Sequence, residues 1–234
     1  MAGASHSLFK RSALFAALVN GAAAGGMLML LKPGLLPPEA AMDRLAYIAA
    51  NPWPWKLVWG SWIAAALCLI FLFAQWGALL DRWSAGDCRG PIVFGVLAGA
   101  LGMIPDTLAE VLYLHHIPLL AREAVETSDP ARQQQLLTSF QTLEPLLAML
   151  TGFLGNGFYT IGGWTLNLVS LRVGRFPRGL AVAGLPIWCS STALSASTVA
   201  GWTAGVTLFT ALTMATFVLW AAAVGLFFRP RRRP

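Results

Sequence analysis

The sequence predicts an all-α fold, a polytopic membrane helix bundle of about six transmembrane helices. Of its 234 residues, 57% are hydrophobic and only 11% are charged, whereas an ordinary soluble domain is about 25% charged. Apolar runs of about 20 residues recur along the chain, which is the length that crosses roughly 30 Å of hydrocarbon. Each run must be helical, because backbone N–H and C=O groups in lipid must pair within their own segment. A soluble enzyme and a nucleic-acid partner are therefore disfavoured, despite the net charge of +6.

Six segments have the required length, and we expect them to form one transmembrane domain over residues 1–234 with a basic tail at 229–234. The first could instead be a cleaved signal peptide, since Lys10 and Arg11 precede an apolar stretch. Apolar residues continue to Leu31, which favours a retained helix. The expected spans are 12–31, 56–80, 91–119, 143–171, 178–197 and 203–228.

The distribution of Lys and Arg predicts that both termini are cytoplasmic, because the side richer in these residues faces the cytoplasm. The poorer side carries Lys32, Arg44, Lys56, Arg122 and Arg132. The richer side carries Lys10, Arg11, Arg82, Arg89, Arg172, Arg175, Arg178, Arg229, Arg231, Arg232 and Arg233. The preference for Arg over Lys, with abundant Ala and Gly, is typical of a GC-rich bacterial genome, so we expect a bacterial inner membrane.

Two outer loops are expected to contain short amphipathic helices. From Glu39 to Ala50, Leu45 and Ile48 recur at helical spacing, which predicts a helix lying on the membrane surface. In the second loop, Asp129 is expected to cap a helix that begins at Pro130 and continues into the fourth span. We expect four tryptophans to anchor the outer interface: Trp53, Trp55, Trp59 and Trp202.

Asp106 and Glu110 in the third span are the most informative residues. An acidic side chain at mid-bilayer costs at least about 2.5–3.5 kcal/mol and normally faces the bundle interior or water. Counting from Pro91 places Asp106 near the bilayer centre and Glu110 about 6 Å nearer the outside. At this spacing, at least one of the two carboxyls is expected to hold a proton near neutral pH, which suits proton exchange.

Small residues share the helix face of the two acids. Gly95, Gly99 and Gly102 lie below Asp106 at helical spacing, so a neighbouring helix can approach closely there. We therefore expect close packing on the inner half of this face and a polar chamber on its outer half. Two other spans carry the same Gly-x-x-x-Gly spacing, at residues 21 and 25 and at 201 and 205.

Four further side chains are candidates for lining this chamber. Asn156 and Tyr159 lie near the middle of the fourth span, Glu144 lies nearer its outer end, and His116 lies at the outer end of the third span. The candidate binding or proton-exchange set is thus Asp106, Glu110, Asn156, Tyr159, Glu144 and His116. The structural alternative is that the acids only tie helices together and that His116 belongs to an interfacial polar collar.

Several cofactor and enzyme classes lack the residues they need, so we expect no cofactor and no metal. A haem held by two histidines fails because His6 lies on the side opposite His115 and His116. A retinal Schiff base needs a mid-membrane Lys, and an intramembrane serine protease needs a deep histidine. Whether the protein is an enzyme stays open, with a non-enzymatic role favoured.

The segment from Ala49 to Lys56, together with Asp106 and Glu110, resembles small uncharacterised bacterial six-helix membrane proteins. That resemblance covers the first half of the chain and implies topology without an activity. Three hypotheses follow. The chamber binds a small solute or cation, or exchanges protons, for transport; or, as in lipid- and sterol-isomerase bundles, it acts on a lipid-like substrate; or the chain is an accessory subunit. Expected partners are the lipid bilayer, a small solute or cation, and a second copy or a larger membrane complex.

Overall fold

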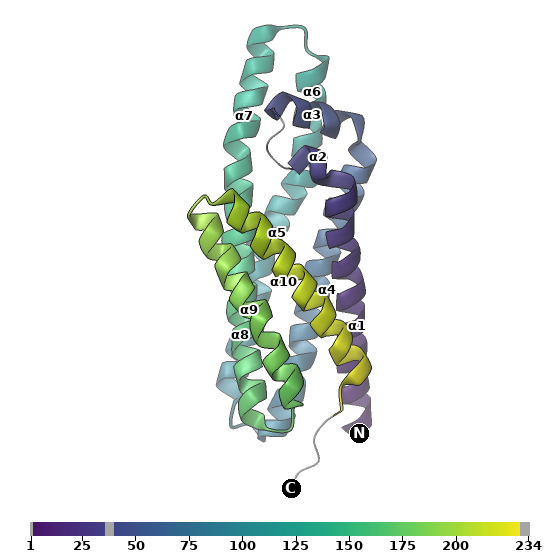
Figure 1. The fold of residues 1–234 in the computed structure, drawn as a ribbon, viewed down its shortest axis with the longest axis vertical. Helices are drawn as coiled ribbons and strands as arrows, with labels where there is room; N and C mark the ends of the chain where they lie inside the picture. Colours follow the sequence, from purple (N-terminus) through teal and green to yellow (C-terminus); the bar gives the residue numbers. More distant parts are fainter. Residues whose placement is uncertain (1, 36–39, 230–234) are drawn as a thin grey trace.

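The computed structural model describes residues 2–35 and 40–229, and these form a long helical bundle (Figure 1). Helix accounts for 92% of the chain, and no strand occurs in the described ranges, which confirms the all-helical prediction. Glu39 and the basic residues Arg231, Arg232 and Arg233 lie outside the described residues.

The long helices run antiparallel, and three of them contain a π-helical segment. The elements in order are α1 (Ala2–Gly26), η1 (Met27–Leu31), α2 (Lys32–Leu35), α3 (Ala41–Ala50), α4 (Pro52–Ser84), α5 (Arg89–Val111), η2 (Leu112–His116), α6 (Ile117–Glu126), α7 (Pro130–Ala148), η3 (Met149–Gly155), α8 (Asn156–Val173), α9 (Arg178–Val199) and α10 (Thr203–Phe227).

Five of these stretches are long and apolar enough to cross a membrane, which supports an integral membrane protein. They are His6–Leu35, Pro52–Ser84, Arg89–Glu126, Arg178–Val199 and Thr203–Phe227. The predicted fourth span at 143–171 lies within the continuous helix from α7 through η3 to α8 and is not among the five.

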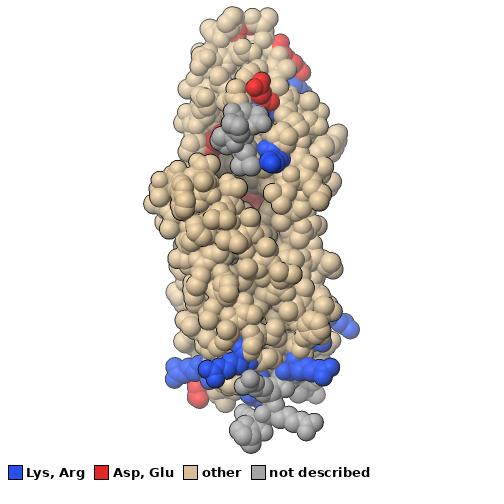
Figure 2. All heavy atoms as spheres, viewed as in Figure 1, with Lys and Arg blue, Asp and Glu red and all other residues tan. Residues whose placement is uncertain are grey.

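The two ends of the bundle differ in charge and in shape. On the face that Figure 2 shows, Lys and Arg gather in a band at one end, and the described chain begins and ends there (Figure 1). At the opposite end, α6 and α7 project as a hairpin beyond the tight turn that joins α9 to α10 (Figure 1). α7 has 19 residues, so this projection amounts to about 28 Å of helix.

The two short helices predicted outside the spans form. α3 buries Leu45 and Ile48 against the projecting end of the bundle, chiefly on α6. Asp129 caps α7 as predicted, because its Oδ1 accepts a hydrogen bond of 2.9 Å from the Ala131 N–H.

The buried core is divided into two clusters. The cluster near the basic end is rich in aromatic rings, including Phe73, Trp76 and Trp220. The cluster near the projecting end joins α3, α4, α6 and α7 around residues such as Trp55 and Phe140. Because the clusters are separate, the helices between them are free to enclose a chamber.

Glycines bring α5 and α8 together between the clusters. A Cβ on Gly162 would lie 2.5 Å from the Gly95 carbonyl oxygen and 3.0 Å from the Gly99 nitrogen, so the two backbones touch. Higher on the same seam, a Cβ on Gly102 would lie 2.7 Å from the Gly155 oxygen. The predicted close approach on the small-residue face of the third span is confirmed.

We predict that Gly162→Ala destabilises the bundle by about 1–3 kcal/mol, because the added methyl must separate two backbones. Gly157→Ala in the same helix is the matched control, since its Cβ would meet only the Ser195 Oγ at 3.8 Å. Thermal unfolding in detergent measures both. Equal unfolding midpoints for the two variants would contradict the glycine seam.

Candidate functional site

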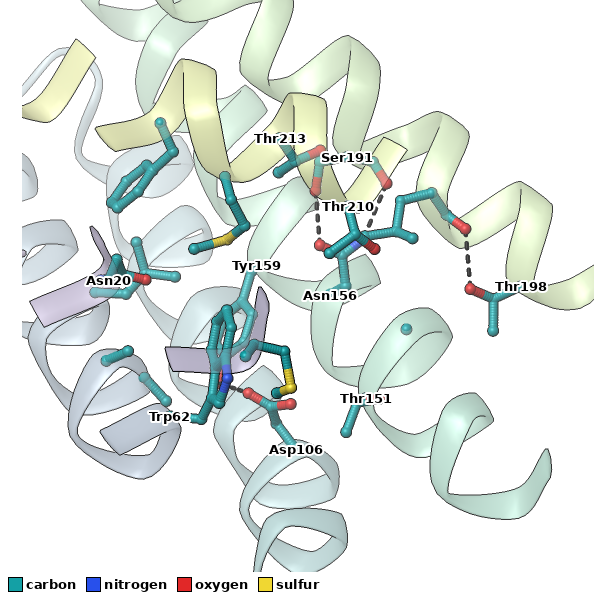
Figure 3. Close-up of a pocket in the computed structure, with 18 of the residues that line it drawn as sticks. Asn20, Trp62, Asp106, Thr151, Asn156, Tyr159, Ser191, Thr198, Thr210 and Thr213 are labelled. Carbon is teal, nitrogen blue, oxygen red and sulfur yellow. Dashed lines mark hydrogen bonds between the residues drawn. The ribbon is translucent and has the colours of Figure 1, made fainter. Parts of the chain in front are cut away.

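A chamber of about 270 Å³ lies between the two core clusters and receives residues from most of the long helices (Figure 3). One wall is apolar and aromatic, with Trp59, Trp62 and Leu69 from α4 and Met214 and Phe217 from α10. The polar part of the lining comprises Asn20, Asp106, Glu110, Thr151, Asn156, Tyr159, Ser191, Thr198, Thr210 and Thr213. Four of the six predicted site residues therefore share one chamber: Asp106, Glu110, Asn156 and Tyr159.

The α5–α8 seam places Asp106. A Cβ on Gly155 would lie 2.9 Å from the Asp106 Cβ, so only a glycine leaves room for this side chain against α8. The Tyr159 hydroxyl, one helical turn along α8, donates a 3.1 Å hydrogen bond to Asp106 Oδ2 (Figure 3). Asp106 is thus held by Tyr159 of the adjacent helix α8 and keeps its second carboxylate oxygen for another partner.

Glu110 lies one turn beyond Asp106 and is almost fully buried, with 2% of its surface exposed. Its Oε2 has no hydrogen-bond partner among the described residues. The indole N–H groups of Trp59 and Trp62, which also line the chamber, are likewise buried without a partner among the described residues. Unsatisfied buried polar groups are costly, so their gathering around one chamber points to a polar guest.

Asn156 is already satisfied by α9. Its Nδ2 donates to the Ser191 carbonyl oxygen at 2.9 Å and to Ser195 Oγ at 2.8 Å, and its Oδ1 accepts from Ser191 Oγ at 2.8 Å. Ser191 Oγ also lies 2.6 Å from Thr160 Oγ1. Asn156 therefore fastens α8 to α9 at the edge of the chamber, and its amide has little left to offer a ligand.

Each π-helical segment gives a backbone carbonyl to a side chain of another helix. The Tyr47 hydroxyl donates to the Leu30 oxygen of η1, Trp55 Nε1 donates to the Tyr113 oxygen of η2 at 2.7 Å, and Ser195 Oγ donates to the Gly152 oxygen of η3 at 3.1 Å. Pro33 and Pro118, placed shortly after η1 and η2, lack the N–H that a regular helix would supply there. π-Helical bulges frequently mark functional sites.

Glu144 does not line the chamber, contrary to the prediction. It pairs with Arg44, whose Nη1 donates to Glu144 Oε2 at 2.9 Å while Nη2 contacts Oε1. Arg44 also donates to the carbonyl oxygens of Gly34 and Leu35, both at 3.2 Å, and its guanidinium lies over the Phe140 ring. This pair ties α2 and α3 to α7 above the chamber.

His116 and two predicted membrane anchors also differ from expectation. His116 is exposed at the end of η2 and does not line the chamber. Trp55 and Trp59 are 1% and 7% exposed, so they belong to the core, whereas Trp53 and Trp202 are exposed as interfacial anchors would be. Trp59 stacks on Tyr113 with ring centroids 3.9 Å apart, which roofs the chamber on the Glu110 side.

Asp106 lies near the turn that joins α9 to α10. Gly152 packs against Thr198, two residues from the end of the apolar α9–α10 hairpin, and Gly155 packs against Asp106. Asp106 therefore lies between one and two helical turns from that end of the hairpin, and Glu110 lies about one turn closer to it.

The aromatic wall and Arg44 were not predicted. The sequence does indicate this wall, because Trp59, Trp62 and Leu69 recur at spacings of three and seven residues along one helix face. Arg44 stands beside Leu45 on the apolar face of α3, and an arginine in that place indicates a buried partner.

The protein-family models, the curated proteins and the solved structures that were compared with this chain contain no match to it.

We predict that Glu144→Ala lowers the free energy of unfolding by about 2–3 kcal/mol, because it leaves Arg44 buried and unpaired. This figure lies at the lower end for a buried pair, since 26% of the Glu144 side chain is exposed. The control is Glu123→Ala, whose pair with Arg132 is about half exposed and contributes at most about 1 kcal/mol. Denaturant unfolding in detergent micelles measures both. Equal losses of unfolding free energy in the two variants would contradict the stabilising role of the Arg44–Glu144 pair.

Proposed function

We propose that this chain is a multi-pass membrane protein whose chamber binds a small cation, an organic ammonium in particular, in exchange for a proton on the Asp106–Glu110 pair. One observation carries the proposal: two carboxyl groups share a chamber whose lining contains no Lys, Arg or His among the described residues. A cation entering such a site meets two acceptors and no opposing charge. The aromatic wall favours an ammonium further, because tryptophan faces attract such cations.

The proposed setting is a bacterial inner membrane crossed six times, with both termini in the cytoplasm. The band of Lys and Arg at the end where the described chain begins and ends supports this orientation (Figure 2). The sixth crossing would be made by η3 and α8 between α5 and α9, at the level of the apolar hairpin. In this orientation the chamber lies in the outer half of the membrane.

Transport would require a second conformation. The aromatic cluster containing Phe73, Trp76 and Trp220 fills the bundle between the chamber and the basic end. A solute at Asp106 therefore has no path inward until this cluster parts. Proton-coupled transport is the extended form of the proposal, with the chamber in its outward-facing state.

The lipid-enzyme alternative has less support. It relied on His116 joining the acids as an acid–base partner, and His116 is exposed outside the chamber. No second function is favoured by a specific contact.

We predict that butylamine, added to the protein in nanodiscs, deprotonates a carboxyl in the chamber. The neutral amine takes the carboxyl proton, and the ammonium that forms pairs with the carboxylate, so the infrared band of a protonated carboxyl decreases. Infrared difference spectroscopy of the wild type, the Asp106→Asn/Glu110→Gln double variant and the control Glu123→Gln measures this. The control keeps the change. Persistence of the full change in the double variant would exclude the pair as the binding site.

A further inference from the structure

The chamber opens sideways, through a gap between α1 and α10. Near the basic end these helices touch, since a Cβ on Gly225 would meet Leu14 and one on Gly21 would lie 3.6 Å from Val218. Gly25 lies on the same side of α1, one turn farther out, and a Cβ there would meet nothing within 4 Å. The two helices have therefore parted between Gly21 and Gly25.

The gap widens toward the projecting end because α10 crosses the bundle diagonally (Figure 1). From Val218 to the start of α10 at Thr203 is about 22 Å of helix. Over this length, Val206, Thr210 and Met214 of α10 line the chamber opposite Met27 of η1. Figure 2 shows a hollow beside the start of α10, with an acidic side chain at its floor.

Two other directions are filled by packed side chains of the described residues. Toward the basic end lies the aromatic cluster with Trp76 and Trp220. Toward the projecting end lie the Trp59–Tyr113 stack and the cluster that the Arg44–Glu144 pair holds in place. Among the described residues, an approach to the carboxyls remains between the apolar helices α1 and α10, beside the start of α10.

We infer that the ligand is an amphiphile with an ammonium head group and an apolar chain, and that it reaches the chamber from the outer leaflet between α1 and α10. This inference rests on the proposed function and specifies its ligand class. The head pairs with Asp106 and the unpartnered Glu110 Oε2, and the tryptophan wall covers it. The apolar chain of the ligand lies along Met27, Val206 and Met214 and leaves through the gap. A water-soluble ligand has no apolar surface to bury there.

The test uses dodecylamine with a photoreactive diazirine in its chain, and the full-length protein in nanodiscs of phosphatidylglycerol, a lipid without an amine. We expect saturable labelling of peptides from η1, α4 and α10. Unlabelled dodecylamine should compete at least about tenfold better than butylamine, and dodecanoate should not compete.

Two variants close the gap from opposite sides. Thr210→Trp fills it from the exposed, chamber-lining side of α10, and Gly25→Trp fills it from α1, where the added side chain starts in open space. Each should lower labelling about tenfold. Leu212→Trp is the matched control, because Leu212 is exposed on α10 and does not line the chamber, and labelling should be unchanged.

Unchanged labelling in both closing variants would overturn the lateral route, and equal competition by butylamine would overturn the role of the chain. Competition by dodecanoate as strong as that by dodecylamine would overturn the ammonium head. These failures are distinguishable from failure of the proposed function, because the infrared response to butylamine depends on the carboxyl pair and needs no apolar chain.

Discussion

Backbone contact between α5 and α8 is the constraint on which the site depends. Gly95, Gly102, Gly155 and Gly162 let two helices approach until backbone atoms touch, and side chains of any size would hold them apart. In lipid, such van der Waals contact replaces the hydrophobic force that packs soluble helices. The same seam fixes Asp106 against α8 within reach of the Tyr159 hydroxyl. The glycine contacts therefore both pack the two helices and position Asp106.

The chamber exists because the rest of the core is split. An aromatic cluster makes the basic end rigid, and the Arg44–Glu144 pair holds the projecting end together by joining α2 and α3 to α7. Between these regions, α10 diverges from α1, and the described side chains leave the space between them unfilled (Figure 1). Breaks in regular hydrogen bonding also concentrate here, since η1, η2 and η3 each give a backbone carbonyl to a side chain of another helix.

The sequence predicted those features that follow from local periodicity. The lengths of the apolar runs predicted the helices, and Asp129 with Pro130 predicted the start of α7. The glycine spacing of the third span predicted that a neighbouring helix approaches it closely. Four of the six predicted residues line one chamber, and each is a carboxyl, an amide or a phenol that stands out in an apolar run. The misplaced features depend on distant partners: Glu144 pairs with Arg44 a hundred residues away, and Trp55 and Trp59 are buried against Tyr113 of the next long helix. Periodicity within one helix carries no information about either.

The central claim is that two carboxyls in this chamber are accessible from the lipid side of the bundle. Carbodiimides modify protonated carboxyl groups, and dicyclohexylcarbodiimide dissolves in the acyl-chain region whereas a water-soluble carbodiimide does not. Mass spectrometry of the protein in nanodiscs after each treatment is the most direct measurement. The account predicts that the lipid-soluble reagent modifies Asp106 or Glu110 and that the water-soluble reagent modifies neither. Full protection of both residues from the lipid-soluble reagent would show a dry, closed seam and contradict the account.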